Sequence, residues 1–208
     1  MAGRIFIVDD EEAIRDALKW LLESCRFEVE TFACGEDFLA GWRPEWDGCL
    51  LLDVRMPGMS GLELFERLKE RECTLPVIFL TGHGDIAMAV EAMHRGAADF
   101  IEKPASDNQL VEKITLSLEK AAQRRQRTVG AESLRTRLRT LTSRETEVMR
   151  LILAGRLNKH IADELNISMR TVEVHRAHVL EKMGVHSAVE LALALAAHQP
   201  PEAEAPAS

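Results

Sequence analysis

The sequence lacks any apolar run that approaches the roughly 20 residues a helix needs to cross a membrane. Its first residues, MAGRIFIVDDEE, turn acidic after four apolar side chains, so they do not form the apolar core of a secretory signal peptide. From these absences we expect a protein that is neither embedded in a membrane nor exported. We therefore expect a cytoplasmic protein with no membrane partner.

Cysteine is scarce, and the spacing of the cysteines carries no motif. The four residues, Cys25, Cys34, Cys49 and Cys73, show no CxxC pair and have no adjacent histidine. This pattern argues against a zinc site or a redox-active dithiol. In a cytoplasmic protein we expect them to be reduced, packed thiols.

Charge is distributed unevenly along the 208 residues, whose net charge is -8. Residues 1–120 contain 13 basic and 24 acidic side chains, a balance of -11, whereas residues 121–208 contain 13 and 10, a balance of +3. The length suits two ordinary domains. The asymmetry predicts two units with different partners, and the second is compatible with a polyanion.

The first half alternates between short apolar segments and helical patterns. Five segments are predicted to be strands: 4–8, 27–32, 49–53, 76–80 and 98–101. Between them, three sets of residues are predicted to share helix faces: Ala13, Ala17, Trp20 and Leu21; Leu62, Phe65 and Leu68; Ile86, Val90 and Met93. Strands that alternate with helices predict an α/β domain whose parallel sheet is covered on both faces.

Polar residues end or follow four of the predicted strands. They are Asp9 and Asp10, Asp53, Thr81, and Lys103 with Pro104. In a parallel sheet the carboxyl ends of the strands meet at one edge, so we expect these side chains to converge. Three neighbouring carboxylates repel one another and need a cation, for which magnesium suits an all-oxygen set of ligands.

These residues lie in motifs of a known family. The segments VDDEE, LLDVRMPGMSG, TGHGD and DFIEKP resemble the receiver domain of two-component response regulators over residues 4 to about 120. The resemblance implies a doubly wound (βα)5 domain over residues 1–120 with strand order 2-1-3-4-5.

The resemblance also implies a role for each polar residue. Asp53 would accept a phosphoryl group from a sensor histidine kinase, and Thr81 and Lys103 would hold its oxygens, with the Lys103–Pro104 bond cis. Magnesium (or manganese) would be bound by Asp10, by Asp9 mainly through water, by Asp53 and by the backbone carbonyl of Arg55. We expect no enzymatic activity other than the receiver's own phosphoryl transfer and hydrolysis.

A switch is implied as well. Phosphorylation would draw in Thr81, and Phe100, at the position of the family's switch aromatic, would turn inward, so that the receiver forms a homodimer. Strand alternation alone would also make Phe100 an ordinary core residue. His83 is placed to modulate attacking water, although a solvated loop histidine is an equal alternative.

The segment 121–140 is predicted to be a helical linker. Leu134, Leu138 and Leu141 have the spacing of a helix that packs against a neighbour. Six arginines are compatible with a phosphate-binding arm, but their pattern favours a solvated helix.

The last part of the chain is predicted to be helical throughout. LTSRETEVMRLILAG opens with a capping box, Thr142 and Glu145, and stops at Gly155. Asn158 is expected to cap NKHIADEL, and Ser168 to cap MRTVEVHRAHVLEKM. Two short helices around a tight turn indicate a helix-turn-helix, although an ordinary helical hairpin has the same spacing.

A helical wheel of the third helix separates a core stripe from a groove face. Val172, Val179 and Met183, flanked by Leu180, are expected to be buried. The opposite face carries few cations, since it presents Arg170, Glu173, Val174, Ala177, His178 and Glu181. The predicted DNA contacts are Asn158, Lys159, Arg170, Thr171, Glu173, Val174, His175, Arg176, Ala177 and His178.

Residues 141–197 resemble the LuxR/NarL-type four-helix DNA-binding domain, and TGHGDIAMAVEAM resembles the FixJ branch. We therefore expect an all-α helix-turn-helix domain at 141–198 and a disordered tail at 199–208. The resemblance implies a phosphorylation-dependent regulator that binds double-stranded operator DNA and RNA polymerase, usually as an activator.

Two alternatives stay open at this point. A haloacid dehalogenase-type phosphatase also uses an aspartate at a strand end with magnesium, but it needs a second aspartate where this chain has Arg55. A DNA-binding regulator switched by a ligand or by protein contact, with a vestigial receiver, is the other. The intact set of acidic residues with Thr81 and Lys103 argues against it.

Overall fold

The structure, a computed structural model, describes residues 3–82, 86–104 and 106–197. The predicted disordered tail and His83 lie outside the described residues. The chain divides into two compact units, Met1–Gln123 and Arg124–Ser208, and each is described by itself. Within the described ranges, no helix is both long enough and apolar enough to cross a membrane.

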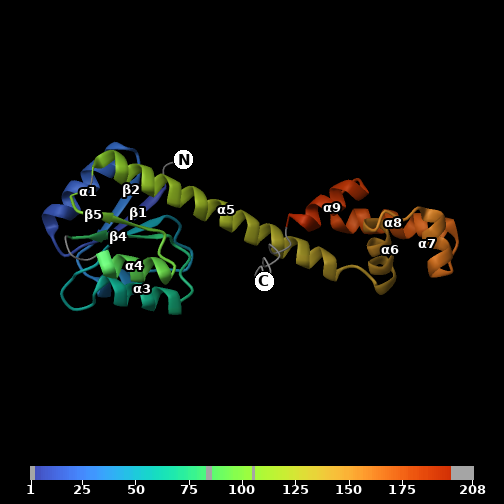
Figure 1. Cartoon of the computed structure of the whole chain (residues 1–208), viewed down its shortest axis with the longest axis horizontal. Helices are drawn as coiled ribbons and strands as arrows, with labels where there is room; N and C mark the ends of the chain where they lie inside the picture. The colour runs from blue at the N-terminus through green and yellow to red at the C-terminus, as the bar shows by residue number, and fades with distance from the viewer. Residues whose placement is uncertain (1–2, 83–85, 105, 198–208) are drawn as a thin grey trace, which may run out of the picture. The chain divides into compact units, whose positions relative to one another are not determined.

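The first unit is built around a five-stranded parallel sheet (Figure 1). Its strands are β1 (Arg4–Val8), β2 (Glu28–Phe32), β3 (Cys49–Asp53), β4 (Val77–Thr81) and β5 (Asp99–Glu102). Each predicted strand is present, and its bounds differ by at most one residue from those expected. The order is β2-β1-β3-β4-β5, as the resemblance implied. The central strands β3 and β4 are buried at every residue, which explains their unbroken apolar sequences.

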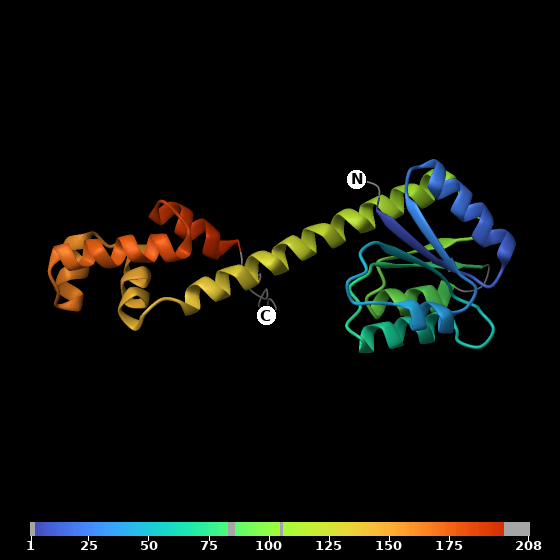
Figure 2. The ribbon, with the colours of Figure 1, turned by 180° about the vertical axis from the view of Figure 1, so that it is seen from behind.

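Helices cover both faces of the sheet (Figures 1 and 2). They are α1 (Glu12–Ser24), α2 (Gly35–Gly41), α3 (Gly61–Glu70), α4 (Ile86–His94) and α5 (Asp107–Arg139). Leu22 of α1 and Ile114 of α5 are buried in the core on one face. Phe38 of α2, Leu64 of α3 and Ala92 of α4 are buried in the core on the other. The doubly wound α/β fold is thereby confirmed.

Two of the predicted helix faces are wrong in part. Trp20 is 75% exposed, Val90 is 45% exposed and Met93 is 38% exposed, whereas Leu22 and Ala92 are fully buried. Neighbouring stripes of a short helix can both be apolar, and the sheet covers only one of them. The expectation of packed cysteine thiols is also wrong in part. All four cysteines are free, but only Cys49 is buried, and Cys25 is exposed.

In the second unit, the C-terminal part of α5 is followed by four helices. They are α6 (Ser143–Leu153), α7 (Asn158–Leu165), α8 (Met169–Met183) and α9 (Ala188–Ala196). Val172, Val179 and Met183 of α8 are buried in their common core, as predicted. Leu134 and Leu138 of α5 and Leu141 pack against the same core, which confirms that this segment is a packing helix.

Candidate functional site

The backbone register gathers the predicted residues at one edge of the sheet. Val8 of β1 pairs with Leu52 of β3, so Asp9 and Asp53 follow side by side. On the other flank, Asp53 pairs with Leu80 of β4, and Thr81 pairs with Glu102 of β5. The residue after Glu102 is Lys103, which therefore reaches the same edge. Segments about 100 residues apart in the chain converge there.

Lys103 joins the two buried carboxylates. Its Nζ donates hydrogen bonds to Asp9 Oδ2 at 2.7 Å and to Asp53 Oδ1 at 2.5 Å. Asp9 is fully buried and Asp53 is 7% exposed. The Lys103–Pro104 peptide bond is cis, as the resemblance implied. One ammonium that bridges two buried anions reduces their repulsion and their desolvation cost.

Burial and the charge of the partner shift the pKa values of Asp53 and Lys103 in opposite directions. Burial raises the pKa of Asp53 above its ordinary range, and the nearby charge of Asp9 adds to this, while Lys103 acts in the opposite direction. Burial lowers the pKa of Lys103, but its hydrogen bonds to Asp53 and Asp9 outweigh burial and leave that pKa raised. Lys103 is therefore a cation at neutral pH, and further positive charge would favour the Asp53 carboxylate.

The backbone at the end of β1 is held from α1. The N–H of Glu11 donates to Asp9 Oδ1 at 2.9 Å, and Arg15 Nη1 donates to the carbonyl oxygen of Asp9 at 2.7 Å. These bonds fix Asp9 toward the sheet edge. Sequence reasoning missed Arg15, because nothing in its position distinguishes it from other arginines on helix surfaces.

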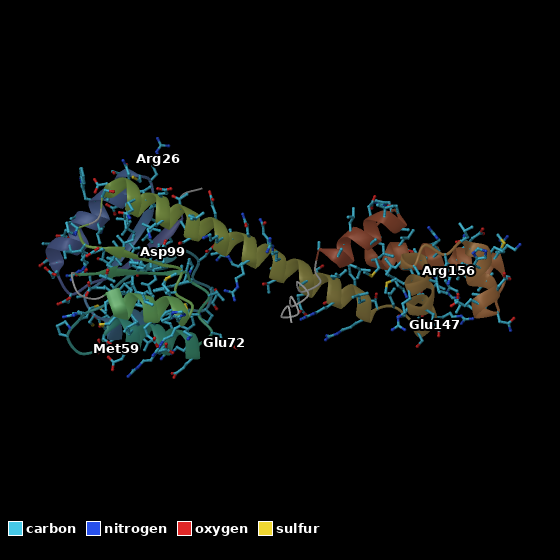
Figure 3. All side chains as sticks on the ribbon, viewed as in Figure 1. Arg26, Met59, Glu72, Asp99, Glu147 and Arg156 are labelled. Atoms are coloured by element: carbon cyan, nitrogen blue, oxygen red, sulfur yellow. The ribbon has the colours of Figure 1, made fainter. Side chains whose placement is uncertain are left out.

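The loop after Asp53 folds back onto the strand end. The N–H of Arg55 donates to Asp53 Oδ2 at 2.8 Å, and the N–H of Gly61 donates to the carbonyl of Val54 at 3.1 Å. Met59, labelled in Figure 3, is 7% exposed and anchors the loop. A Cβ on Gly61 would lie 2.0 Å from the backbone oxygen of Asp53, so only glycine permits this close approach.

Thr81 and Phe100 have other partners in this structure. The Thr81 hydroxyl donates to the carbonyl of Ile101 at 3.3 Å. Phe100 is half-buried, and Lys113 holds its strand by donating to Asp99 Oδ1 at 2.6 Å and to the Phe100 carbonyl at 2.9 Å. Asp99 is labelled on β5 in Figure 3. Lys113 was not predicted, since only the folded strand reveals its two acceptors.

The donor set suits a divalent cation in its chemistry. Asp9 and Asp53 already share the Lys103 ammonium, and the adjacent Asp10 is exposed to solvent. Carboxylate oxygens with a backbone carbonyl such as that of Arg55 are ligands that magnesium prefers. Across the described ranges, no three Asp, Glu, His or Cys side chains stand close enough together to hold an ion.

The helix-turn-helix residues form an exposed surface on α8. All six residues of the predicted groove face are exposed: Arg170, Glu173, Val174, Ala177, His178 and Glu181. Thr171, His175 and Arg176 are half-buried, and Lys159 of α7 is exposed. The division into core and groove faces is therefore as the wheel predicted. Whether these residues contact DNA stays a prediction.

One of the predicted caps is wrong. The Thr142–Glu145 capping box and the Ser168 cap are present, and Gly155 has a φ of 71° just past α6. Asn158, however, is the first residue of α7 and caps nothing, because the helix begins one residue earlier than a cap at this position requires. Its Oδ1 accepts a hydrogen bond from Arg176 Nη1 at 3.3 Å, which ties α7 to α8.

Basic residues also fasten the C-terminal end of α8. Arg137 of α5 donates to the carbonyl of Met183 at 2.7 Å, and Lys182 donates to the carbonyl of Thr140 at 3.1 Å. Lys182 also pairs with buried Glu145 Oε2 at 2.7 Å. A basic residue near a helix C-terminus is the one signal that could have indicated Lys182.

Comparison with known proteins agrees with this geometry. Residues 5–115 match the family model described as the response regulator receiver domain, and residues 139–195 match bacterial regulatory proteins of the luxR family. The chain belongs to the response regulators. The resemblance drawn from the motifs is confirmed, and the dehalogenase-type alternative is wrong.

This chain is similar to known proteins over nearly its whole length. It is 48% identical to the C4-dicarboxylate transport transcriptional regulatory protein DctR of Rhodobacter capsulatus, over 92% of this chain and 98% of that one. It is 42% identical to the transcriptional regulatory protein FixJ of Bradyrhizobium diazoefficiens, over 91% and 92%. Among solved structures, the response regulator StyR has 43% identity and a TM-score of 0.82, over 94% of this chain and 99% of that one.

Proposed function

We propose that this response regulator accepts a phosphoryl group on Asp53 from a sensor histidine kinase in the cytoplasm, and that the modification controls DNA binding by α8. The observation that carries this proposal is the Lys103 ammonium that bridges buried Asp9 and Asp53. A carboxylate at a strand end, buried and beside a fixed cation, is poised for attack on phosphorus. The 48% identity with a transcriptional regulatory protein supports the role in transcription.

The chemistry requires little beyond positioning. A phosphorus–nitrogen bond of a phosphohistidine breaks while a bond forms between phosphorus and a carboxylate oxygen of Asp53. Lys103 would stabilise the charge on the phosphoryl oxygens, and Thr81 would donate its hydroxyl to one of them. Asp9, Asp10, Asp53 and the carbonyl of Arg55 would hold magnesium (or manganese), which supplies neutralisation of charge between the carboxylate and the phosphoryl group.

The bond that Thr81 now makes provides the switch. To reach the phosphoryl group, its hydroxyl would have to leave the carbonyl of Ile101. Phe100, which is half-buried on the next strand, would then turn inward. The surface around α4 and β5 changes as a result, and we propose that it forms a homodimer. Exposed Val90 and Met93 supply apolar area on that surface.

DNA recognition would use the exposed face of α8 and the start of α7. Arg170, near the N-terminus of α8, is the basic residue placed to reach a base edge. A dimer would present two such helices to two half-sites of double-stranded operator DNA. Bound there, the dimer would recruit RNA polymerase and act as an activator, with no enzymatic reaction beyond its own phosphorylation and dephosphorylation.

Substituting Asp53→Asn is expected to abolish phosphorylation. With acetyl phosphate and a magnesium salt, the wild type should give a slower band on a phosphate-affinity gel, and the variant should give none, because an amide oxygen is a poor nucleophile. Asp47→Asn serves as the control, since it removes an exposed carboxylate from the same domain. An undiminished band for Asp53→Asn would refute Asp53 as the phosphoryl acceptor, and the absence of a band for the wild type would favour the vestigial-receiver alternative.

Phosphorylation is also expected to change the oligomeric state. Sedimentation velocity of the full chain should show a monomer that becomes a dimer after treatment with acetyl phosphate and magnesium. Val90→Lys should stay monomeric, because a charge would lie in the apolar contact. Identical profiles for the treated and untreated wild type would refute the dimer.

A further inference from the structure

Positive charge in the second unit is concentrated on α5 and not on the helix-turn-helix. Residues 121–140 contain six arginines and one glutamate, a balance of +5. Residues 141–198 contain seven basic and seven acidic side chains, a balance of zero. DNA affinity depends largely on neutralisation of phosphates, so the helix-turn-helix alone is poorly equipped for it.

Four of the arginines make one stripe along α5. Arg124, Arg127, Arg135 and Arg139 are exposed, and at 3.6 residues per turn they fall on the same side of the helix. Arg135 lies 3.9 Å from Glu132, a weak and highly exposed ion pair. Within the described residues, the other three have no ion pair. We call these four residues the arginine stripe.

Helix α5, which carries the arginine stripe, is fixed to α8. Leu134 and Leu138 pack into the core beneath α8, and Arg137 donates to the carbonyl of Met183 at 2.7 Å. Gly184 leaves room for that arginine, because a Cβ there would lie 2.6 Å from Arg137 Nη1. With 15 residues, α8 is about 22 Å long, less than one turn of B-DNA at about 34 Å. A bound duplex longer than one turn therefore extends beyond α8, and α5 is the helix that is fixed at the C-terminal end of α8.

We propose that the arginine stripe binds backbone phosphates of the duplex beside the base pairs read by α8. The four guanidinium groups pack into no core, the helix-turn-helix lacks net charge, and the duplex is the polyanion that this unit engages. The inference rests on the proposed DNA binding. It revises the expectation of a merely solvated linker helix, which considered the segment without the neutral domain beside it.

The test is the salt dependence of DNA binding by the full chain. The probe is a mixed-sequence duplex of about 40 base pairs, because phosphate binding is independent of sequence. Replacing all four arginines with glutamine keeps good helix formers on α5. The slope of log K against log salt should fall by about 2 to 4, roughly one for each phosphate that is no longer neutralised, and affinity at low salt should fall at least tenfold.

A matched control removes the same charge elsewhere. Lys19, Arg26, Arg67 and Lys69 lie in the first unit, and changing all four to glutamine should leave the slope unaltered. On a duplex of about 12 base pairs, barely longer than one turn, the stripe variant should differ little from the wild type. Circular dichroism verifies that each variant folds.

Other outcomes overturn the proposal. An unaltered slope for the stripe variant on the long duplex means that the arginines are solvated. Tighter binding by that variant means that the stripe contacts the acidic first unit instead. If the wild type itself fails to bind either duplex before and after treatment with acetyl phosphate, the proposed DNA binding fails and not merely the stripe.

Discussion

Gly61→Ala is expected to destabilise the first unit by about 3 kcal/mol, the upper end of the usual cost of overpacking. The new Cβ would lie 2.0 Å from the backbone oxygen of Asp53, so either strand β3 or the start of α3 must shift. Alanine gains about 1 kcal/mol of helix propensity over glycine, which is too little to offset a collision between backbone atoms. All three tryptophans lie in this unit, so denaturant unfolding followed by their fluorescence measures the loss.

Gly41→Ala is the matched control for this prediction. Gly41 is the last residue of α2, and a Cβ there would meet only Phe32 and Trp46, at 3.7 and 3.8 Å. We expect it to change the free energy of unfolding by less than about 1 kcal/mol. If Gly61→Ala is equally mild, the loop after Asp53 moves freely and does not constrain the carboxylate. Because Gly61→Ala should shift the backbone beside Asp53, we also expect that variant, and not Gly41→Ala, to be phosphorylated more slowly by acetyl phosphate.

Much of the site was predictable because it depends on order along the chain. A carboxylate directly after an apolar run is at the carboxyl end of a strand, and parallel strands bring such ends together. Asp9 and Asp53 follow from this rule alone, and Thr81 and Lys103 were expected at the same edge because they also lie just beyond apolar runs. The strand order, by contrast, came from the family resemblance, since alternation of strands and helices is compatible with several orders.

What could not be predicted depends on contacts across the fold. Trp20 and Leu22 both lie on apolar stripes of α1, and only the packing against the sheet decides which one is buried. The Thr81 hydroxyl has an acceptor on β5 that no local pattern reveals. Asn158 has the chemistry of a cap, but its helix starts at Asn158 itself, so its side chain is left to accept from Arg176.

Glu145→Gln is expected to destabilise the second unit by about 2 kcal/mol at neutral pH. The side chain is 4% exposed, and its Oε2 accepts from Lys182 at 2.7 Å and from the Thr142 N–H at 2.8 Å. Glutamine preserves the capping box but leaves Lys182 without its anion. Because Lys182 is one-third exposed, water moderates the cost. Amide hydrogen exchange in α6 and α8 measures this unit, which contains no tryptophan.

The destabilisation caused by Glu145→Gln should depend on pH, and the depressed pKa of Glu145 determines the direction of that dependence. The hydrogen bond from Lys182, and then that from Thr142, lower the pKa of Glu145 from its ordinary 4.5 to about 2. A carboxylate whose pKa is depressed on folding contributes fully above pH 4.5, and that contribution disappears as the pH falls from 4.5 toward 2. The stabilities of the wild type and of Glu145→Gln should therefore converge in acid.

Glu63→Gln is the control that tests whether the capping position alone accounts for the effect, because Glu63 forms the same capping box with Ser60 but on an exposed helix end. If both variants lose equal protection in their own helices, the negative charge at the helix N-terminus and not the buried ion pair with Lys182 stabilises α6.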